Sequence, residues 1–307
     1  LKELKKKFQV EIHTGKIPIP QKTLKSKIKE VDGLICFPYD KIDKEIIQSA
    51  KNLKVISTYS VGYDHIDTQF AKENKIRVGY TPEVLTDATA NMAFALLLDS
   101  LRRISEGDRI IRKGKWKQIY GAYDYVGLDL QSKTLGIIGL GRIGKILAKR
   151  AKAFDMKIIY HNRKQILKTE EKKLGVKHTT FDKLITQSDI ISVHVPHTKE
   201  TNQMFDMKIF KKMKKTAFLI NTSRGKIVNE KDLVAALKLK IIGGAGLDVF
   251  ETEPIKKNHS FLKLENIVLA PHVGSSTKET RIKMAEITTK NLILGMKGKK
   301  PIYSIGY

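Results

Sequence analysis

The sequence predicts an α/β protein with doubly wound parallel sheets, and two observations support this. Short apolar runs typical of buried strands alternate with helical patterns along most of the 307 residues. One such run, 134–138, leads into the glycine-rich segment GLGRIG at 139–144, which is followed by another helical pattern. A chain of this length is expected to form two domains.

The first half of the chain has the pattern of successive βα units. Strands are predicted at Gln9–His13, Gly33–Phe37, Lys54–Thr58 and Ile76–Tyr80. Helices are predicted to end near Phe8, to begin near Pro20, and to cover Ile42–Ala50 and Asp67–Asn74. We expect one long helix from Thr86 to about Arg112, whose rich apolar stripe should pack between domains or subunits. Residues 114–127 have no assignable pattern.

The second half completes a Rossmann-like sheet. After the strand at 134–138, strands are predicted at 157–160, 189–195, 216–220, 242–247 and 267–270. Helices are predicted at 181–187, 207–213, 230–238 and about 278–296.

The glycine-rich segment predicts a dinucleotide site. Gly139 would allow a tight turn, Gly141 would let the backbone approach a pyrophosphate, and Gly144 would let the helix pack closely on the strand. Such a motif alone is weak, but here it has the required strand before it and helix after it.

The strand at 157–160 ends where an acidic residue would bind the ribose 2′-hydroxyl of NAD. Asn162 stands there, and the cations Arg163 and Lys164 follow it. A 2′-phosphate would meet positive charge, so NADP(H) is favoured and NAD(H) is the alternative. The competing interpretation is that both cations are ordinary surface charges in a lysine-rich chain.

The formal net charge of +26 raises the question of nucleic-acid binding. The lysines are spread along the chain without a basic stripe interleaved with aromatic residues, so nucleic acid is an unlikely partner and a general attraction for anions is expected. No apolar run is long enough to span a bilayer, and there is no signal-peptide core. The single cysteine, Cys36, is expected to be a reduced core residue, which favours the cytoplasm. No metal site is predicted.

Reactive side chains follow three successive predicted strands. Arg224 lies in the loop after 216–220, Glu253 in the loop after 242–247, and His272 in the loop after 267–270. Parallel strands place these loops on the edge that also carries the glycine-rich segment. Protonated His272 would donate its proton to a substrate carbonyl, Glu253 would orient the imidazole, and Arg224 would bind a carboxylate. This set suits hydride transfer between a nicotinamide and a 2-oxo acid.

Each of these residues also has a purely structural interpretation. The prediction of an active site therefore rests on the three residues occurring together. Arg224 could cap a strand end, Glu253 could be a surface acid, and His272 could be a loop histidine. The other histidines lack a matching carboxylate and arginine; His194 is expected in the core, and His197 has no evident partner.

These motifs together make the family recognisable. The chain resembles the D-isomer-specific 2-hydroxyacid dehydrogenases over nearly its whole length, in the motifs SVGYDHID (60–67), GLGRIG (139–144), NTSRG (221–225), GLDVF (246–250) with Glu253 and Pro254, and PHVGS (271–275). Within that family it is most similar to glyoxylate/hydroxypyruvate reductases, in the motifs IST (56–58), RVGYTP (77–82) and VLTD (84–87). The resemblance implies reduction of small 2-oxo acids to glycolate or D-glycerate by a homodimer.

The resemblance also implies roles for individual residues. The catalytic set would be Arg224, Glu253 and His272, and the substrate would be held by Arg224, His272, Val61, Gly62 and Ser275. The cofactor would contact Gly139, Gly141, Arg142, Ile143, Gly144, Asn162, Arg163, Lys164, Pro196, Thr222, Asp248 and Gly274. A substrate domain would be formed by both chain ends, 1–88 and 276–307, and a dinucleotide-binding domain by 89–275.

Two departures and three rival functions remain open. The first strand of the family is absent, so either the chain is truncated or the substrate domain has one strand fewer. In place of a tryptophan that reaches the partner's site in animal relatives, the chain has GAYDY at 121–125. The rival functions are another D-2-hydroxyacid dehydrogenase such as a phosphoglycerate dehydrogenase, a dinucleotide-sensing scaffold resembling a corepressor, and a nucleic-acid-binding protein.

Overall fold

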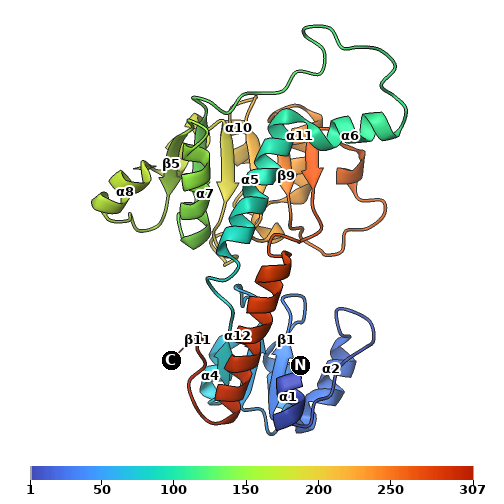
Figure 1. Ribbon diagram of the computed structural model, residues 1–307, viewed down its shortest axis with the longest axis vertical. Coiled ribbons are helices and arrows are strands. Elements are labelled where there is room, and N and C mark those ends of the chain that lie inside the picture. The colour runs from blue at the N-terminus through green and yellow to red at the C-terminus, as the bar shows by residue number, and fades with distance from the viewer. Residues whose placement is uncertain (1, 307) are drawn as a thin grey trace. The chain divides into compact units, whose positions relative to one another are not determined.

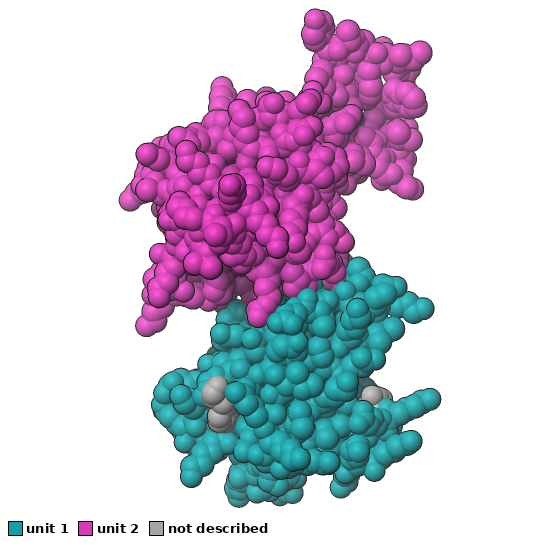
Figure 2. All heavy atoms as spheres, turned by 60° about the vertical axis from the view of Figure 1, so that its left-hand side comes forward, with its two compact units in different colours: residues 1–85, 276–307 teal, residues 86–275 magenta. Residues whose placement is uncertain are grey.

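The computed structural model describes residues 2–306 and divides into two compact units. Unit 1 comprises residues 1–85 and 276–307, and unit 2 comprises residues 86–275 (Figure 2). Each unit contains one sheet built mainly of parallel strands with helices on it (Figure 1). The predicted α/β class with doubly wound parallel sheets is therefore confirmed.

Unit 1 has a four-stranded sheet in the order β1-β2-β3-β11. Its strands are β1 (Gly33–Cys36), β2 (Val55–Thr58), β3 (Arg77–Gly79) and β11 (Ser304–Ile305), and only β11 is antiparallel to its neighbour. Its helices are α1 (Lys2–Lys7), α2 (Gln21–Lys27), the 3-10 turn η1 (Ile28–Glu30), α3 (Lys44–Ser49), α4 (Thr68–Glu73) and α12 (Lys278–Met296).

Neighbouring residues of β2 face opposite sides of this sheet. Val55 packs with Leu4 of α1 and Leu292 of α12, whereas Ile56 belongs to a core with residues of α2, α3 and α4. Cys36 lies in this second core, where burial raises the pKa of its thiol to about 12 and keeps it protonated. The expectation of a buried core cysteine is confirmed.

The predicted strand at Gln9–His13 is wrong. This segment has no strand partner among the described residues, and the structure forms no β-ladder there. Val10 packs beside Leu4, but Ile12 is 49% exposed. The alternating apolar residues therefore place one side chain, Val10, against a helix. The segment has no neighbouring strand to bond its backbone N–H and C=O groups.

Unit 2 has a seven-stranded, fully parallel sheet in the order β10-β9-β8-β7-β4-β5-β6. The strands are β4 (Thr134–Ile138), β5 (Lys157–His161), β6 (Lys177–His178), β7 (Ile190–Val193), β8 (Phe218–Asn221), β9 (Gly244–Leu247) and β10 (Ile267–Leu269). The order reverses between β4 and β7, as in dinucleotide-binding sheets, where the ligand lies at this reversal.

Helices cover both faces of this sheet. They are α5 (Thr86–Arg102), α6 (Ile104–Arg112), α7 (Arg142–Lys152), α8 (Lys168–Leu174), α9 (Phe181–Gln187), α10 (Met207–Lys212) and α11 (Glu230–Lys238), with 3-10 turns η2 (Gly225–Ile227) and η3 (Ser260–Lys263). Leu135 and Ile137 of β4 share a core with α5 and α7, which lie side by side in Figure 1. Ile138 shares the opposite core with α9, α10 and α11.

The predicted long helix from Thr86 to Arg112 is two helices. Arg103 has a left-handed backbone with φ of 58°, which ends α5 and begins α6. The guanidinium of Arg103 pairs with Glu106 at 2.6 Å and lies 4.2 Å from the ring centre of Tyr125. α5 packs on α7, β8 and β9 within unit 2, and α6 with the loop after it stands away from the sheet (Figure 1).

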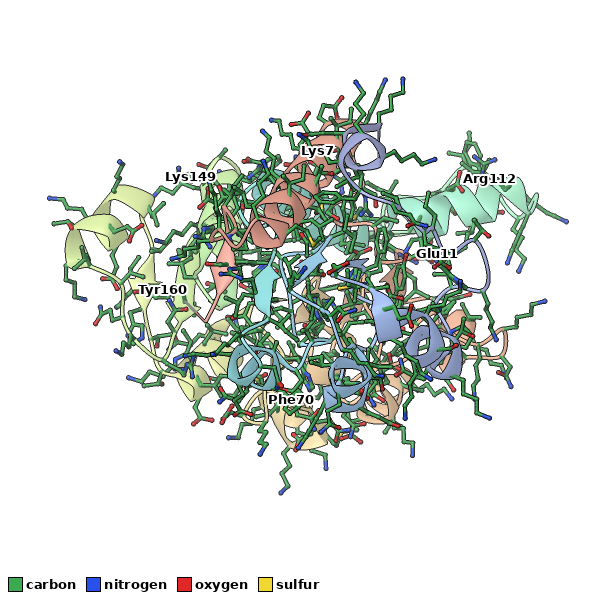
Figure 3. All side chains as sticks on the ribbon, turned by 90° about the horizontal axis from the view of Figure 1, so that it is seen from below. Lys7, Glu11, Phe70, Arg112, Lys149 and Tyr160 are labelled. Atoms are coloured by element: carbon green, nitrogen blue, oxygen red, sulfur yellow. The ribbon has the colours of Figure 1, made fainter. Side chains whose placement is uncertain are left out.

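The excess of positive charge is distributed over many elements. Figure 3 shows nitrogen-tipped side chains around the periphery, including the labelled Lys7 of α1, Arg112 of α6 and Lys149 of α7. Within residues 2–306, none of the helices has the length and apolar character needed to cross a membrane.

Gly295 tests how tightly α12 packs on the sheet of unit 1. An added Cβ would lie 2.6 Å from Cβ of Val55. We expect Gly295→Ala to lower the free energy of unfolding of unit 1 by about 1–2 kcal/mol, because overpacking outweighs the higher helix propensity of alanine. Urea unfolding measures this change. Lys290→Ala, at an exposed position of the same helix, is the control and should change stability by less than about 0.5 kcal/mol. Equal stability of both variants would contradict the packing argument.

Candidate active site

Three loops follow the carboxyl ends of β8, β9 and β10, which are neighbours in the sheet of unit 2. They carry Arg224, Glu253 and His272, respectively. Asn221 pairs with Leu247 across β8 and β9, and Leu247 pairs with Leu269 across β9 and β10. Because the three strands end at the same level, their loops start from one edge.

His272 and Glu253 form a hydrogen-bonded pair. Nδ1 of His272 lies 2.6 Å from Oε2 of Glu253, and the side chains are 36% and 32% exposed. Glu253 is held in turn by the backbone N–H of Phe250, which donates to Oε1 at 2.9 Å. The carboxylate therefore fixes a proton on Nδ1 and leaves Nε2 as the nitrogen that faces other groups. His272 has a left-handed backbone with φ of 54°.

Asp248 fixes the loop that carries His272. Its two carboxylate oxygens accept the backbone N–H groups of Val273 at 2.8 Å and Gly274 at 2.7 Å. Burial raises the pKa of Asp248, the two backbone hydrogen bonds and His272 oppose this shift, and Glu253 adds to it. Ser275 follows Gly274 directly and ends unit 2.

The loop of Arg224 is braced by a buried asparagine. Nδ2 of Asn221 donates to the carbonyl of Arg224 at 2.9 Å, and Oδ1 accepts the N–H of Ser223 at 3.0 Å. The next residue, Gly225, touches the loop after β9, since a Cβ there would lie 1.8 Å from the carbonyl carbon of Phe250. The loops of Arg224 and Glu253 are thus in direct backbone contact.

The glycine-rich segment has two glycines in crowded positions and one in an open position. Gly139 has φ of 94°, and a Cβ there would lie 2.7 Å from the carbonyl oxygen of His194. A Cβ at Gly144 would lie 2.6 Å from the carbonyl oxygen of Gly139. Gly141 has no atom within 4 Å of an added Cβ. α7 begins directly after it with Arg142 and Ile143, so the space in front of Gly141 and the helix N-terminus fit a pyrophosphate.

Asn162 is tied to the glycine-rich segment. Its Oδ1 accepts the backbone N–H of Leu140 at 2.7 Å. Arg163 and Lys164, which follow, are exposed.

Two further residues near this edge have features that fit a bound group. Oγ1 of Thr222 is buried and has no hydrogen-bond partner within residues 2–306, so a ligand atom would satisfy it. Pro196 lies in the loop after β7, where its carbonyl accepts the hydroxyl of Thr201 at 2.7 Å. These positions, together with the open face of Gly141, are compatible with a dinucleotide.

His194 lies outside the strand in which it was predicted. It lies one residue beyond β7 instead of inside the strand, and its carbonyl closes over Gly139 at the reversal of strand order. Its Nε2 lies 2.8 Å from Oγ of Ser192, and burial lowers the pKa of His194 to about 4, which keeps the ring neutral. The sequence signal that could have indicated this placement is the position of His194 at a strand end, directly before Val195 and Pro196.

Val61 and Gly62 lie in unit 1, in the loop after β2. Oγ of Ser60 donates to the carbonyl of Gly62 at 2.6 Å and lies 2.8 Å from Oγ1 of Thr58. Oγ1 of Thr58 lies 3.0 Å from Nε2 of His65. Hydrogen bonds from side chains of the same unit therefore hold this loop.

Comparison with known proteins gives a consistent result. The family model described as "D-isomer specific 2-hydroxyacid dehydrogenase, NAD binding domain" matches residues 94–274. The chain is 48% identical over 304 residues to a glyoxylate reductase of Thermococcus litoralis, covering 98% of this chain and 91% of that protein.

Solved structures agree. A Thermus thermophilus protein has a TM-score of 0.91 at 40% identity, covering 99% of this chain and 95% of that one. An NADPH-dependent glyoxylate/hydroxypyruvate reductase of Sinorhizobium meliloti, solved with NADP and malonate, has a TM-score of 0.83 at 32% identity, covering 92% and 86%. The fold and site define a dinucleotide-binding α/β protein. The chain belongs to the D-isomer-specific 2-hydroxyacid dehydrogenase family, which confirms the resemblance.

The contrast between Gly139 and Gly141 predicts opposite tolerance to alanine. Gly139→Ala should lower the free energy of unfolding of unit 2 by about 2 kcal/mol or more, because it combines a positive φ with a backbone overlap. Gly141→Ala should change it by less than about 0.5 kcal/mol. Thermal unfolding without added ligand measures both. A Gly141 variant as unstable as the Gly139 variant would show that the open space is filled.

Proposed function

We propose that the protein is a reductase of small 2-oxo acids that prefers NADPH and converts glyoxylate to glycolate and hydroxypyruvate to D-glycerate. The observation that carries the proposal is the 2.6 Å pair of His272 and Glu253, on the same sheet as an open glycine-rich turn. The glyoxylate reductases among its relatives support the substrate class.

His272 is proposed as the general acid. Its Nδ1 is engaged by Glu253, so in the protonated ring Nε2–H is free of this bond and donates its proton to the carbonyl oxygen of the substrate. The nicotinamide, when bound, supplies the hydride to the carbonyl carbon. The carboxylate of Glu253 stabilises the imidazolium before transfer and keeps the ring oriented after it.

Arg224 and the loop after β2 are proposed to bind the substrate carboxylate. Arg224 carries a permanent, planar charge that pairs with a carboxylate and polarises the neighbouring carbonyl. The backbone N–H groups of Val61 and Gly62 would bind the same carboxylate, and Ser275 would lie on the substrate side. In this scheme the substrate domain is 1–88 with 276–307, and the dinucleotide-binding domain is 89–275.

The remaining predicted residues are proposed to hold the dinucleotide. Gly139, Gly141, Arg142, Ile143 and Gly144 would contact the pyrophosphate, and Pro196, Thr222, Asp248 and Gly274 would lie on the nicotinamide side. Asn162, Arg163 and Lys164 would meet the adenosine ribose, where an uncharged residue and two exposed cations favour a 2′-phosphate. The reducing cytoplasm would suit the buried, protonated thiol of Cys36.

Steady-state kinetics test the proposed reaction. The purified protein should oxidise NADPH with glyoxylate and hydroxypyruvate, with kcat/KM about 10-fold higher for NADPH than for NADH, and should use a bulkier 2-oxo acid poorly. His272→Ala should lower kcat by about 10²- to 10⁴-fold, because the proton donor is lost. Arg163→Ala should reduce the preference for NADPH while leaving turnover with NADH unchanged.

The outcomes separate the proposals. A preference for NADH would contradict the assignment of the cofactor alone. Tight dinucleotide binding without turnover of any 2-oxo acid would contradict the reductase and favour the scaffold. A salt-sensitive gel shift with nucleic acid, unaffected by His272→Ala, would favour the nucleic-acid-binding protein.

We further propose that the protein is a homodimer joined through the arm formed by residues 104–127. The apolar side chains of this arm are strongly exposed: Ile104 60%, Ile111 61%, Trp116 54%, Ile119 90% and Tyr123 93%. Large apolar side chains exposed together on one arm are typical of a protein–protein interaction site. The base of the arm is fixed, since the hydroxyl of Tyr125 donates to the carbonyl of Arg103 at 2.5 Å.

Ile119→Glu tests this interface. A charge at the most exposed isoleucine of the arm should raise the dimer dissociation constant about 100-fold, because it would be buried without a partner. Sedimentation velocity at several concentrations measures this. Leu239→Glu, at a leucine 71% exposed outside the arm, is the matched control and should leave the dimer intact. A monomeric wild-type protein would contradict the proposal.

A further inference from the structure

Glu230 and Glu251 each accept a hydrogen bond from the other's backbone, beside the loops that carry Arg224 and Glu253. We call this pair of hydrogen bonds the clasp. Oε1 of Glu230 accepts the backbone N–H of Glu251 at 2.8 Å, and Oε1 of Glu251 accepts the backbone N–H of Glu230 at 3.0 Å. Glu230 begins α11, so its N–H has no acceptor inside the helix. The clasp therefore joins the start of α11 to the loop after β9 through two groups that would otherwise lack partners.

This clasp lies at the point where the loops of Arg224 and Glu253 meet. Gly225, next to Arg224, is packed against Phe250 and Glu251, and a Cβ there would lie 2.4 Å from the backbone nitrogen of Glu251. The turn η2 then leads from Gly225 toward α11. On the other side, Phe250 holds the carboxylate of Glu253. One clasp thus restrains both loops.

His259 lies against the clasp. Its Nδ1 accepts the N–H of Phe261 at 3.3 Å, so the proton of the neutral ring lies on Nε2, which is 3.2 Å from Oε2 of Glu230. Burial raises the pKa of Glu230, the backbone hydrogen bond from Glu251 opposes this, and the negative charge of Glu251 adds to it. His259 also stabilises the ionised form of Glu230.

We propose that Glu230 is a positioning residue of the reaction, whose carboxylate holds the loop after β9 so that Glu253 stays on His272 and Arg224 keeps its place. This inference rests on the proposed reductase. Glu230 does not contact the reacting atoms in this scheme; it acts through Glu251, Phe250 and Glu253 on His272. The charged groups that face this chain of contacts are Glu251 and His259 at the clasp, and Asp248 beside His272 and Glu253.

Three substitutions distinguish geometry from charge. Glu230→Gln keeps the length and an acceptor oxygen, Glu230→Asp keeps the charge but withdraws the acceptor by one methylene, and Glu230→Ala removes both. We expect kcat for 2-oxo acid reduction to fall about 10- to 100-fold in Glu230→Asp and Glu230→Ala, with the KM for the dinucleotide within about 2-fold of wild type. Glu230→Gln keeps the acceptor for the N–H of Glu251 and loses only the bond from His259, so it should retain more activity than Glu230→Asp.

The pH profile gives a readout that simple destabilisation would not move. When Glu253 is no longer held on His272, the imidazolium loses its nearby negative charge. The pH profile for reduction should therefore differ from that of wild type in Glu230→Ala and Glu230→Asp. Asp182→Asn removes an exposed carboxylate from the first turn of α9 and is the control, with an unchanged profile.

Amide hydrogen exchange tests the clasp without turnover. The N–H of Glu251 should exchange at least about 10-fold faster in Glu230→Asp than in wild type, and at the wild-type rate in Asp182→Asn. Faster exchange in a protein that reduces no 2-oxo acid would support the clasp and contradict only the reductase. Wild-type kcat and pH profile in Glu230→Asp, or lower activity in Glu230→Gln than in Glu230→Asp, would overturn the positioning role.

Discussion

The parallel pairing of β8, β9 and β10 is the constraint on which the site depends. Because Asn221, Leu247 and Leu269 stand level across the three strands, each strand releases its loop at the same edge. The three candidate catalytic residues are separated along the chain, and only this register brings their loops together. A shift of one strand by a single residue would turn its side chains to the other face of the sheet. The cores on both faces oppose such a shift, since Leu219 and Ile220 of β8 belong to opposite cores, as do Ile267 and Val268 of β10.

Backbone N–H groups at this edge are matched with carboxylates. Asp248 binds the loop of His272, Glu253 binds Phe250, and Glu230 and Glu251 bind each other's backbone. Burial raises the pKa of Asp248 and Glu230, and the hydrogen bonds that these two carboxylates accept from backbone N–H groups oppose that shift. These bonds hold the loops that carry Glu253 and His272, and Arg224 and His272 are the groups proposed to meet an anionic substrate.

The fold could be predicted from the sequence wherever periodicity and strand ends determine it. Apolar runs such as Ile190–Val193 and the capped helix at 230–238 are local signals, and the structure has both. The break at Arg103 could not be predicted, because arginine is a good helix former and the left-handed turn is stabilised by Glu106 and Tyr125 in the folded chain. The strand predicted at Gln9–His13 does not form, for the opposite reason. Its alternating pattern is a local signal, but a strand needs a neighbouring strand to bond its backbone N–H and C=O groups.

The sequence could predict that the candidate site residues lie in loops after neighbouring strands, but it could not predict the residues that hold those loops. Arg224, Glu253 and His272 follow strand ends, where reactive groups gather in parallel sheets. Glu230 begins a helix and would be interpreted as an ordinary acid favoured by the helix dipole. Its bond to Glu251 depends on how α11 meets the loop after β9, and nothing in the spacing of the two residues encodes that distance.

Under the proposed function, Asn162 favours a 2′-phosphate more specifically than the cations beside it do. Lysine and arginine make up 58 of 307 residues, so two of them after a strand are weak evidence in this chain. Asn162, however, has a defined structural task, since its Oδ1 accepts the N–H of Leu140 in the glycine-rich turn. An aspartate could accept the same hydrogen bond, and an ionised acceptor would make it stronger. Holding the turn therefore does not require an amide, and under the proposed function what the amide changes is the charge that would meet the ribose.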